Sequence, residues 1–345
     1  MSPSPSLEAR FRAAVEDHRA GRLQEAEAGY RALIAAQPDL VVAHQNLVAL
    51  LRAQARTEDL APAYQDLLAL EPSDEVRHAL ALNLLRLGRY AEAWPHFEHR
   101  ASKPASGPPG AAAEWQGEPL DGRAILIWQE QGPGDQIQMA RYVPLLQAMG
   151  AKVQFACAPA LTRLLAPFCE TVARGPETPG RWDYWVSSMS LPGRFGTTLE
   201  TAPPPLPIAS RPGGTGVGVM ATGSPLHEFD RFRSLPPEMA ARLSALPGAV
   251  SLDPNATGDK DLAEAAEIVA GLAGVVTVDT AMAHLAASMG KPTFILLSAI
   301  WSDWRWGLGR ADTPWYPSAR LIRQPSPGDW EGALAEAAGA VAALA

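Results

Sequence analysis

The stretch EQGPGD, from Glu130 to Asp135, places an acid and two glycines directly after a run of apolar residues. Glycines there allow the backbone to approach a ligand closely, and an aspartate at the entrance to a helix can cap the helix or project into a cleft. The stretch is not a Walker phosphate loop, because no G-K-[ST] follows, and it lacks the third glycine of a dinucleotide fingerprint. Two interpretations of Asp135 stay open: a helix-capping acid, and an acid that takes a proton from an acceptor.

A second apolar run ends at Asp279 and leads into TAMAHLAASMG. Thr280 is expected to cap the helix that starts there, and the free N–H groups of the first turn, together with the helix dipole, suit a phosphate. His284 lies one turn into this helix, where it can donate to a phosphate or a sugar hydroxyl. The alternative for His284 is ordinary packing in an alanine-rich helix.

Between these two stretches lies a polar loop, SPLHEFDRFRSLP, from Ser224 to Pro236. Its arginines Arg231 and Arg233 follow a predicted strand, where bidentate contacts can clamp a diphosphate. A solvated loop is the alternative. Taken together, the three stretches favour a nucleotide-linked anion held by the second half of the chain, with an acid from the first half facing it.

Short apolar runs alternate with helical stretches from residue 121 onward, which is the pattern of parallel β-α-β units. The predicted strands are 124–129, 152–158 and 182–190 in a first half (residues 121–206), and 217–222, 249–253, 274–279 and 293–298 in a second half (residues 214–345). Two such halves place the carboxyl ends of their strands around one cleft, where ligands bind by default. The sequence therefore predicts an α/β architecture with its site between two Rossmann-like halves.

Residues 1–100 contain a repeat. Tyr30 and Tyr64 lie 34 residues apart, as do Pro38 and Pro72, and a third copy begins near Leu85. This period, with turn glycines at Gly21 and Gly88 and with the paired tyrosines and helix-ending prolines, identifies tetratricopeptide repeats. Residues 101–120 contain several prolines and glycines and are expected to form a linker.

The composition excludes some classes of function. The chain of 345 residues has 29 Lys and Arg against 37 Asp and Glu, a net charge of −8, so a nucleic-acid partner is not expected. Its two cysteines, Cys157 and Cys169, suit buried thiols in a reducing compartment, and no metal site is expected. No apolar run of about 18 residues predicts a membrane span, and we expect a cytoplasmic protein.

The motifs in combination resemble the heptosyltransferase-type glycosyltransferases, and more closely their bacterial relatives with N-terminal tetratricopeptide repeats. The resemblance runs from about Leu7 to Trp330. The stretches that carry it are W-x-G-x-P-L-x-G (Trp115 to Gly122), E-Q-G-x-G-D (Glu130 to Asp135), H-x-x-D-R-x-R-S (His227 to Ser234), D-T-x-x-x-H-L-A (Asp279 to Ala286) and a tryptophan-rich tail (Asp303 to Gln324).

This resemblance implies α-helical repeats followed by a GT-B fold, and a metal-independent, inverting transfer from a nucleotide-activated sugar with no cofactor. Under it, Asp135 corresponds to the general base that acts on the acceptor hydroxyl. The residues expected to bind the donor are Gly134, Arg233, Asp279, Thr280, Ala281 and His284, and further cleft contacts from the first half are expected at Gln131 and Gln138.

Two positions depart from the pattern of the resemblance. Related sequences often have glycine where Ala281 stands, and if the backbone there needs a positive φ the strain costs about 1–2 kcal/mol. Relatives also commonly have tryptophan at the position of Met220, which implies a reshaped pocket for the donor base or sugar.

The leading hypothesis is a glycosyltransferase that moves a sugar from a nucleotide donor to a hydroxyl of a bacterial protein, for example a surface or flagellar protein, held by the repeats. One alternative is a non-catalytic scaffold, in which the repeats bind partners and the GT-B domain is degenerate. A transferase for a small molecule or a lipid-linked sugar is another, but it leaves the repeats unexplained.

Overall fold

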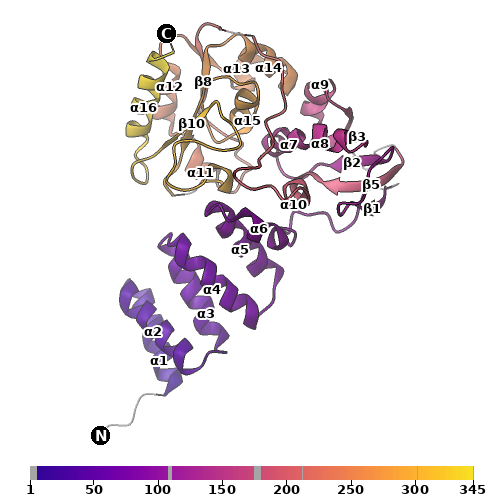
Figure 1. Ribbon diagram of the computed structural model, residues 1–345. Helices are drawn as coiled ribbons and strands as arrows, with labels where there is room; N and C mark the ends of the chain where they lie inside the picture. The colour runs from indigo at the N-terminus through magenta and orange to yellow at the C-terminus, as the bar shows by residue number, and fades with distance from the viewer. Residues whose placement is uncertain (1–5, 108–110, 175–179, 212, 301, 345) are drawn as a thin grey trace. The chain divides into compact units, whose positions relative to one another are not determined.

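The computed structural model describes residues 6–107, 111–174, 180–211, 213–300 and 302–344 (Figure 1). These residues form two compact units, Met1–Ala101 and Ser102–Ala345, and each is described by itself. The first unit is helical, and the second contains two parallel β-sheets.

The first unit consists of antiparallel helix pairs, as the repeat predicts. Its helices are α1 (Leu7–Arg19), α2 (Leu23–Ala36), α3 (Val41–Ala53), α4 (Thr57–Leu70), α5 (Asp74–Arg86) and α6 (Tyr90–Phe97). The repeated aromatics Tyr30 and Tyr64 are buried between helices, and α2 and α4 both end two residues before the repeated prolines. The side chains of Ser6 and Ser73 cap α1 and α5 by accepting from the N–H groups of Ala9 and Val76.

The turn between the two helices of a repeat uses the left-handed backbone conformation. Gly21 and Gly88 have φ values of 75° and 78° in the first and third turns, whereas the second turn has Ala55 at φ 53°. A residue with a Cβ is disfavoured in this conformation, so the second repeat carries local backbone strain.

Replacing Ala55 with glycine is therefore expected to raise the free energy of unfolding by about 1 kcal/mol. The matched control is Ala53→Gly at the exposed end of α3, which is expected to lower it by about 0.5–1 kcal/mol because glycine weakens a helix. Chemical denaturation of both variants measures the two effects. Loss of stability in Ala55→Gly would contradict the assignment of strain to this turn.

The first half of the second unit is a parallel sheet in the order β1-β5-β2-β3-β4. Its strands are β1 (Ala111–Glu114), β2 (Ala124–Trp128), β3 (Lys152–Cys157), β4 (Glu170–Ala173) and β5 (Trp182–Ser187), and its helices are α7 (Pro133–Met139), α8 (Val143–Ala148), α9 (Thr162–Leu165) and α10 (Leu191–Arg194). Strand β2 is the middle strand, and its continuous apolar sequence reflects burial on both faces. A short 3₁₀ turn, Ala140–Tyr142, separates α7 from α8.

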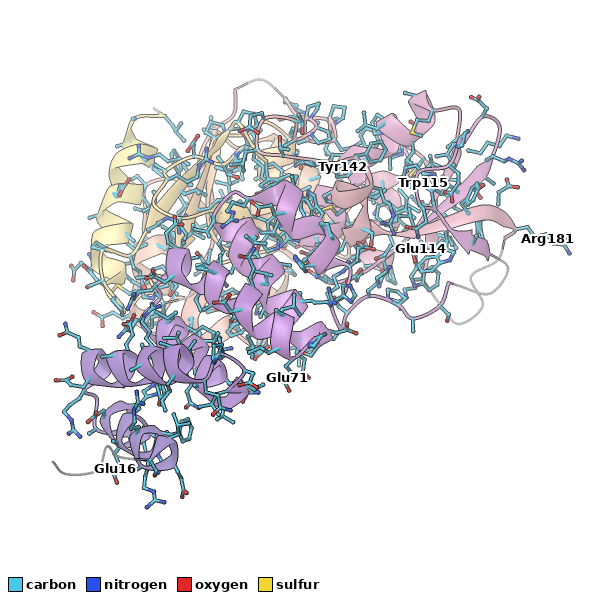
Figure 2. The ribbon with its side chains drawn as sticks, turned by 60° about the horizontal axis from the view of Figure 1, so that its bottom comes forward. Glu16, Glu71, Glu114, Trp115, Tyr142 and Arg181 are labelled. Atoms are coloured by element: carbon cyan, nitrogen blue, oxygen red, sulfur yellow. The ribbon has the colours of Figure 1, made fainter. Side chains whose placement is uncertain are left out.

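Strand β1 lies in the range assigned to a linker from the sequence. It pairs with β5, so the first sheet begins before residue 121. Trp115, which directly follows β1, is buried in this half of the unit and is labelled with Tyr142 in Figure 2. Its ring lies 5.7 Å from that of Phe195, which in turn stacks on Tyr142 with ring centroids 5.4 Å apart. Small alanines in β1 carry no alternating pattern, which explains why this strand escaped the sequence analysis.

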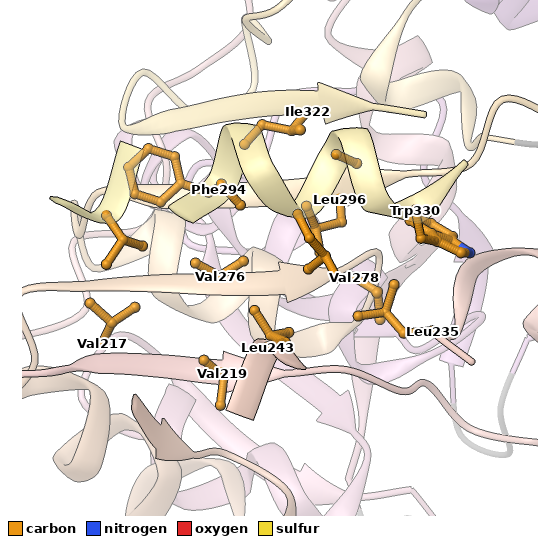
Figure 3. Close-up of a cluster of buried hydrophobic side chains, with 14 residues drawn as sticks. Val217, Val219, Leu235, Leu243, Val276, Val278, Phe294, Leu296, Ile322 and Trp330 are labelled. Carbon is orange, nitrogen blue, oxygen red and sulfur yellow. The ribbon is translucent and has the colours of Figure 1, made fainter. Parts of the chain in front are cut away.

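The second half is a parallel sheet in the order β10-β9-β8-β6-β7. Its strands are β6 (Val217–Met220), β7 (Ala249–Ser251), β8 (Gly274–Val278), β9 (Thr293–Leu297) and β10 (Ala319–Arg323), and its helices are α11 (Asp230–Arg233), α12 (Pro237–Ser244), α13 (Pro254–Thr257), α14 (Leu262–Ala270), α15 (Ala281–Ser288) and α16 (Trp330–Ala342). Val276, Phe294 and Leu296 pack beneath α16, which closes this core from one side (Figure 3).

Each sheet has a point at which the strand order reverses. In the second sheet it lies between β6 and β8, and in the first it lies between β2 and β5. Crevices at the carboxyl ends of strands next to such a reversal are where ligands bind in open α/β sheets. The two stretches that the sequence analysis singled out, after β2 and after β8, begin at these two points.

Two further expectations concern the thiols and the membrane. Cys157 is buried and Cys169 is partly buried, and neither forms a disulfide. None of the helices in the described ranges has the length and apolarity needed to cross a bilayer.

Candidate functional site

The second unit contains a cavity of about 860 Å³ between the carboxyl ends of its two sheets. Its lining includes the loop after β2, the loop after β6, the first turn of α15 and the 303–305 turn. The residues proposed for the site from the sequence that line it are Gln131, Gly134, Asp135, Arg233, Asp279, Thr280, Ala281 and His284. Met220, the position at which relatives commonly have tryptophan, also lines this cavity.

The loop after β2 is held in place by buried hydrogen bonds. Glu130 is 3% exposed, and its carboxylate accepts from the hydroxyls of Ser102, over 2.6 Å, and Ser187. The next residue, Gln131, has φ 62°, a left-handed conformation that is strained for a residue with a side chain. Its carbonyl accepts from the side-chain amide of Gln136 over 3.3 Å. This loop therefore has a defined, strained shape at the cavity wall.

Asp135 both caps its helix and faces the cavity, so the two interpretations from the sequence are compatible. It occupies the third position of α7, where its Oδ2 accepts from the N–H of Gly132 over 2.9 Å. Its Oδ1 accepts from Arg305 over 2.5 Å. Burial raises the pKa of Asp135, Arg305 opposes that rise, and nearby Asp303 adds to it. A carboxylate whose pKa is raised in this way is a better proton acceptor than an exposed one.

Arg305 is the main site residue that the sequence analysis missed. It is 3% exposed, and it donates to Asp303 over 2.8 Å as well as to Asp135 and to the side-chain oxygen of Gln138. Burial alone lowers the pKa of Arg305, but Asp303 and Asp135 raise it above its usual value. Its only sequence signal was its place in the tryptophan-rich tail, because its partners Asp135 and Gln138 lie about 170 positions earlier in the chain.

The expectation that Gln138 contacts the cleft is corrected by the structure. Gln138 is fully buried and is not part of the cavity lining. Its side-chain oxygen accepts from Arg305 instead. Gln138 and Asp135 are three residues apart on α7 and so lie on one face of the helix, which lets both bind the same guanidinium.

Gly134 allows two helices to approach, in addition to lining the cavity. A Cβ added there would lie 2.6 Å from Cδ2 of His284 and 3.2 Å from Cα of Ala281. The start of α7 is therefore in direct contact with the start of α15. Ala281 does not have a positive φ, so the strain considered for this position does not arise.

His284 is held by aromatic neighbours on the inner side of α15. Its Nδ1 lies 2.8 Å from the hydroxyl of Tyr316, and its ring lies 5.4 Å from that of Trp306. Burial, with the positive charges of Arg305 and Arg141, lowers the pKa of His284 well below its usual value. The imidazole is therefore neutral at pH 7, and its Nδ1 already forms a hydrogen bond with Tyr316.

Arg233, which also lines the cavity, is fixed by two hydrogen bonds. The polar loop that carries it forms the short helix α11, and Arg233 donates to Asp230 over 3.0 Å and to the carbonyl of Asp279 over 2.7 Å. Thr280 caps α15, as the sequence predicts, by accepting from the N–H of Met282. Arg231 is exposed and stacks on Phe232, outside the cavity lining.

Asp279 titrates near neutrality. Burial and the neighbouring carboxylate of Asp303 raise its pKa to about 7, against the opposing charges of Arg233 and Arg305. Among the described residues no cluster of three or more His, Cys, Asp or Glu has the arrangement of a metal site. Arg233 and Arg305, together with the start of α15, supply positive charge beside the carboxyl of Asp279.

Residues 231–307 match the sequence model of glycosyltransferase family 9 (heptosyltransferase). The matched stretch includes Arg233, the start of α15 and Arg305, and it confirms the resemblance drawn from the motifs. The heptosyltransferase-like domain match does not extend to Asp135, which lies in the first half.

One relative and two solved structures also resemble the chain. Protein FlbA of Caulobacter vibrioides is 27% identical over 331 residues, covering 77% of this chain and 54% of FlbA, so the chain spans about half the length of that curated relative. A family 9 glycosyltransferase from Veillonella parvula is 12% identical with a TM-score of 0.43, covering 63% of this chain and 92% of that one. SycD, a type III secretion translocator chaperone of Yersinia enterocolitica, is 19% identical with a TM-score of 0.25, covering 28% and 74%.

The contact at Gly134 can be tested with two glycine-to-alanine changes. Gly134→Ala is expected to lower the free energy of unfolding by about 1–3 kcal/mol, because the new methyl group overlaps His284 and the α15 backbone. The control is Gly339→Ala at an exposed position of α16, where a Cβ meets nothing within 4 Å and a gain of about 0.5–1 kcal/mol is expected. Chemical denaturation measures both. Equal effects of the two changes would rule out a tight α7–α15 contact.

The pKa of Asp279 predicts a pH dependence of stability. A carboxyl with a folded pKa of about 7, above its ordinary 3.8, contributes stability at low pH that is lost as the pH rises through 7. Asp279→Asn removes this loss. The free energy of unfolding of the variant is therefore expected to exceed that of wild type by on the order of 1–4 kcal/mol at pH 8, and by less toward pH 5. Asp312→Asn, at an exposed aspartate with a lowered pKa, serves as control and is expected to bring no such gain. Unfolding curves of the three proteins are measured at pH 8 and pH 5. An equal difference in the free energy of unfolding between Asp279→Asn and wild type at both pH values would contradict the raised pKa of Asp279.

Proposed function

We propose that this protein is a glycosyltransferase that moves a sugar from a nucleotide-activated donor to a hydroxyl group. The observation that carries the proposal is that a partly buried acid of the first half, Asp135, and the start of α15 in the second half line one cavity. The family 9 domain supports the same class of reaction. The location in the cytoplasm expected from the sequence stays a prediction.

In the proposed reaction the donor diphosphate lies at the start of α15. The partial positive charge of a helix N-terminus favours a phosphate group, and Thr280, Ala281 and Met282 of this first turn line the cavity. Arg233 adds a fixed positive charge beside Asp279. These groups would stabilise the negative charge that develops on the leaving diphosphate without a metal ion.

Asp135 is proposed as the general base. The acceptor hydroxyl gives its proton to the Asp135 carboxylate while its oxygen forms a bond to the anomeric carbon, and the bond from that carbon to the diphosphate breaks. A single displacement of this kind inverts the anomeric configuration. Asp135 is suited to the role because it is largely shielded from water, its carboxylate is fixed by two hydrogen bonds, and it borders the cavity.

The repeats are proposed to hold a polypeptide acceptor. Stacked helix pairs form extended surfaces that bind extended or helical peptides. A peptide bound there would supply Ser or Thr hydroxyls. This assignment of the acceptor is an inference from the presence of the repeats in the same chain as the family 9 domain.

Binding of the donor can be tested before the acceptor is known. Thermal unfolding is measured with UDP, GDP, ADP, CDP and CMP, on wild type and on His284→Ala. One nucleotide is expected to stabilise wild type, by about 2.7 kcal/mol at 100 times its Kd, and to lose most of this effect on the variant. Stabilisation by none of the five would favour the non-catalytic scaffold.

The role of Asp135 is tested by the isosteric change Asp135→Asn. With the sugar nucleotide chosen from the binding panel, the variant is expected to bind the nucleotide normally and to lose about 10²–10⁴ in kcat, because the amide cannot accept the proton. Asp312→Asn, outside the cavity, is the control and should transfer sugar at the wild-type rate. Unchanged turnover in Asp135→Asn would eliminate Asp135 as the base.

A further inference from the structure

The guanidinium of Arg305 connects the two halves through side chains on a single helix. Nη2 donates to Oδ1 of Asp135 over 2.5 Å, and Nε donates to Oε1 of Gln138. Both partners lie on α7 of the first half, three residues apart. On the other side, Nη1 donates to Asp303 of the second half over 2.8 Å, so every nitrogen of the guanidinium is bound.

This contact is shielded from water. The side chains of Arg305 and Asp135 are 3% and 20% exposed, and the ring of Trp304 lies 4.6 Å from the guanidinium carbon. A guanidinium stacked on a ring and bound at every nitrogen has a fixed position. Removal of one partner from a buried ion pair is costly, because the remaining charge stays buried alone.

Asp135 depends on this guanidinium for its charge. Burial raises the pKa of Asp135, and Arg305 is the cation that opposes the rise. Without it, a buried carboxyl tends to take up a proton and remain neutral. If Asp135 were removed instead, Arg305 would still have one carboxylate partner, Asp303.

We propose that Arg305 is a positioning residue for Asp135: it keeps the carboxylate ionised and oriented, and it does so only while the two halves are together. The acid comes from one half and the guanidinium from the other, so opening of the cavity would separate them. The catalytic part of this inference rests on the proposed function, in which Asp135 is the base. Arg305 would thereby make the base active only in the closed arrangement.

A double-mutant cycle on the full chain tests the contact without any substrate. Free energies of unfolding are measured for wild type, Asp135→Asn, Arg305→Gln and the double variant at pH 7.5. We expect non-additivity of at least tenfold in the unfolding equilibrium constant, because Asp135 takes up a proton once Arg305 is removed and then behaves like Asn. Additive effects would overturn the proposal.

The pH dependence of the coupling between Asp135 and Arg305 distinguishes an electrostatic contact from a packing contact. The coupling is expected to weaken as the pH falls from 7.5 to 4.5, because it requires the ionised form of Asp135. Coupling of equal size at both pH values would show a packing contact only and would overturn the proposed electrostatic role.

Arg163 provides a matched control, because it also connects the two halves. Its Nη1 lies 2.9 Å from Asp261 and 3.3 Å from Glu264, but the Arg163 side chain is 57% exposed. Arg163→Gln is expected to change the unfolding constant by less than about fivefold, as for other exposed pairs, and to leave the pH profile of sugar transfer unchanged. An effect of Arg163→Gln on the unfolding constant as large as that of Arg305→Gln would mean that any contact between the halves suffices, against a specific role for Arg305.

A kinetic readout tests the positioning role itself. With the sugar nucleotide chosen from the binding panel, the acid limb of kcat/KM is expected to move to higher pH by about 1–3 units in Arg305→Gln. Arg305→Lys, which keeps a positive charge, should show a smaller shift of the acid limb than Arg305→Gln. A lowered kcat with an unmoved acid limb would overturn the proposal. If no sugar nucleotide is turned over by wild type, the proposed function fails, whereas the double-mutant cycle still decides whether Arg305 controls the ionisation of Asp135.

Discussion

The arrangement of the site depends on one buried positive charge. Arg305 is enclosed by carboxylates from both halves, and neither it nor Asp135 would be stable as a lone charge at that depth. The first sheet has to present α7 at the point where the second sheet presents the 303–305 turn. Arg305 compensates the charge of Asp135 only where α7 and the 303–305 turn meet. The relative position of the two sheets is therefore expected to control whether the Asp135 carboxyl is ionised.

Close packing at Gly134 supports this electrostatic link. The start of α7 contacts the start of α15 so closely that even a Cβ on Gly134 would overlap the ring of His284. His284 fills the space and is fixed by Tyr316 and Trp306, which come from the segment that also supplies Arg305. The acid of the first half and the helix start of the second are therefore held next to each other by van der Waals contact as well as by charge.

The balance of charge in the cavity also constrains its ligand. Its lining includes Asp135, Asp253, Asp259, Asp279 and Asp303 against Arg233 and Arg305. An anionic ligand is favoured in such surroundings only where local positive potential outweighs the acids. The start of α15 supplies such potential, and the raised pKa of Asp279 reduces the negative charge beside it near neutral pH. Binding of an anionic ligand and protonation of Asp279 are thus expected to favour each other.

The sequence alone determined the elements and much of the site: the repeats, most of the strands, and the placement of Asp135, Thr280 and His284 around one cavity. Local patterns suffice there, because strand periodicity, helix caps and the rule on strand ends act over short stretches. Strand β1 was missed because a run of alanines carries no periodicity. The partners of Arg305 and the packing role of Gly134 were decided only by the tertiary structure. These contacts join residues far apart in the chain, and no local pattern encodes a distance between two sheets.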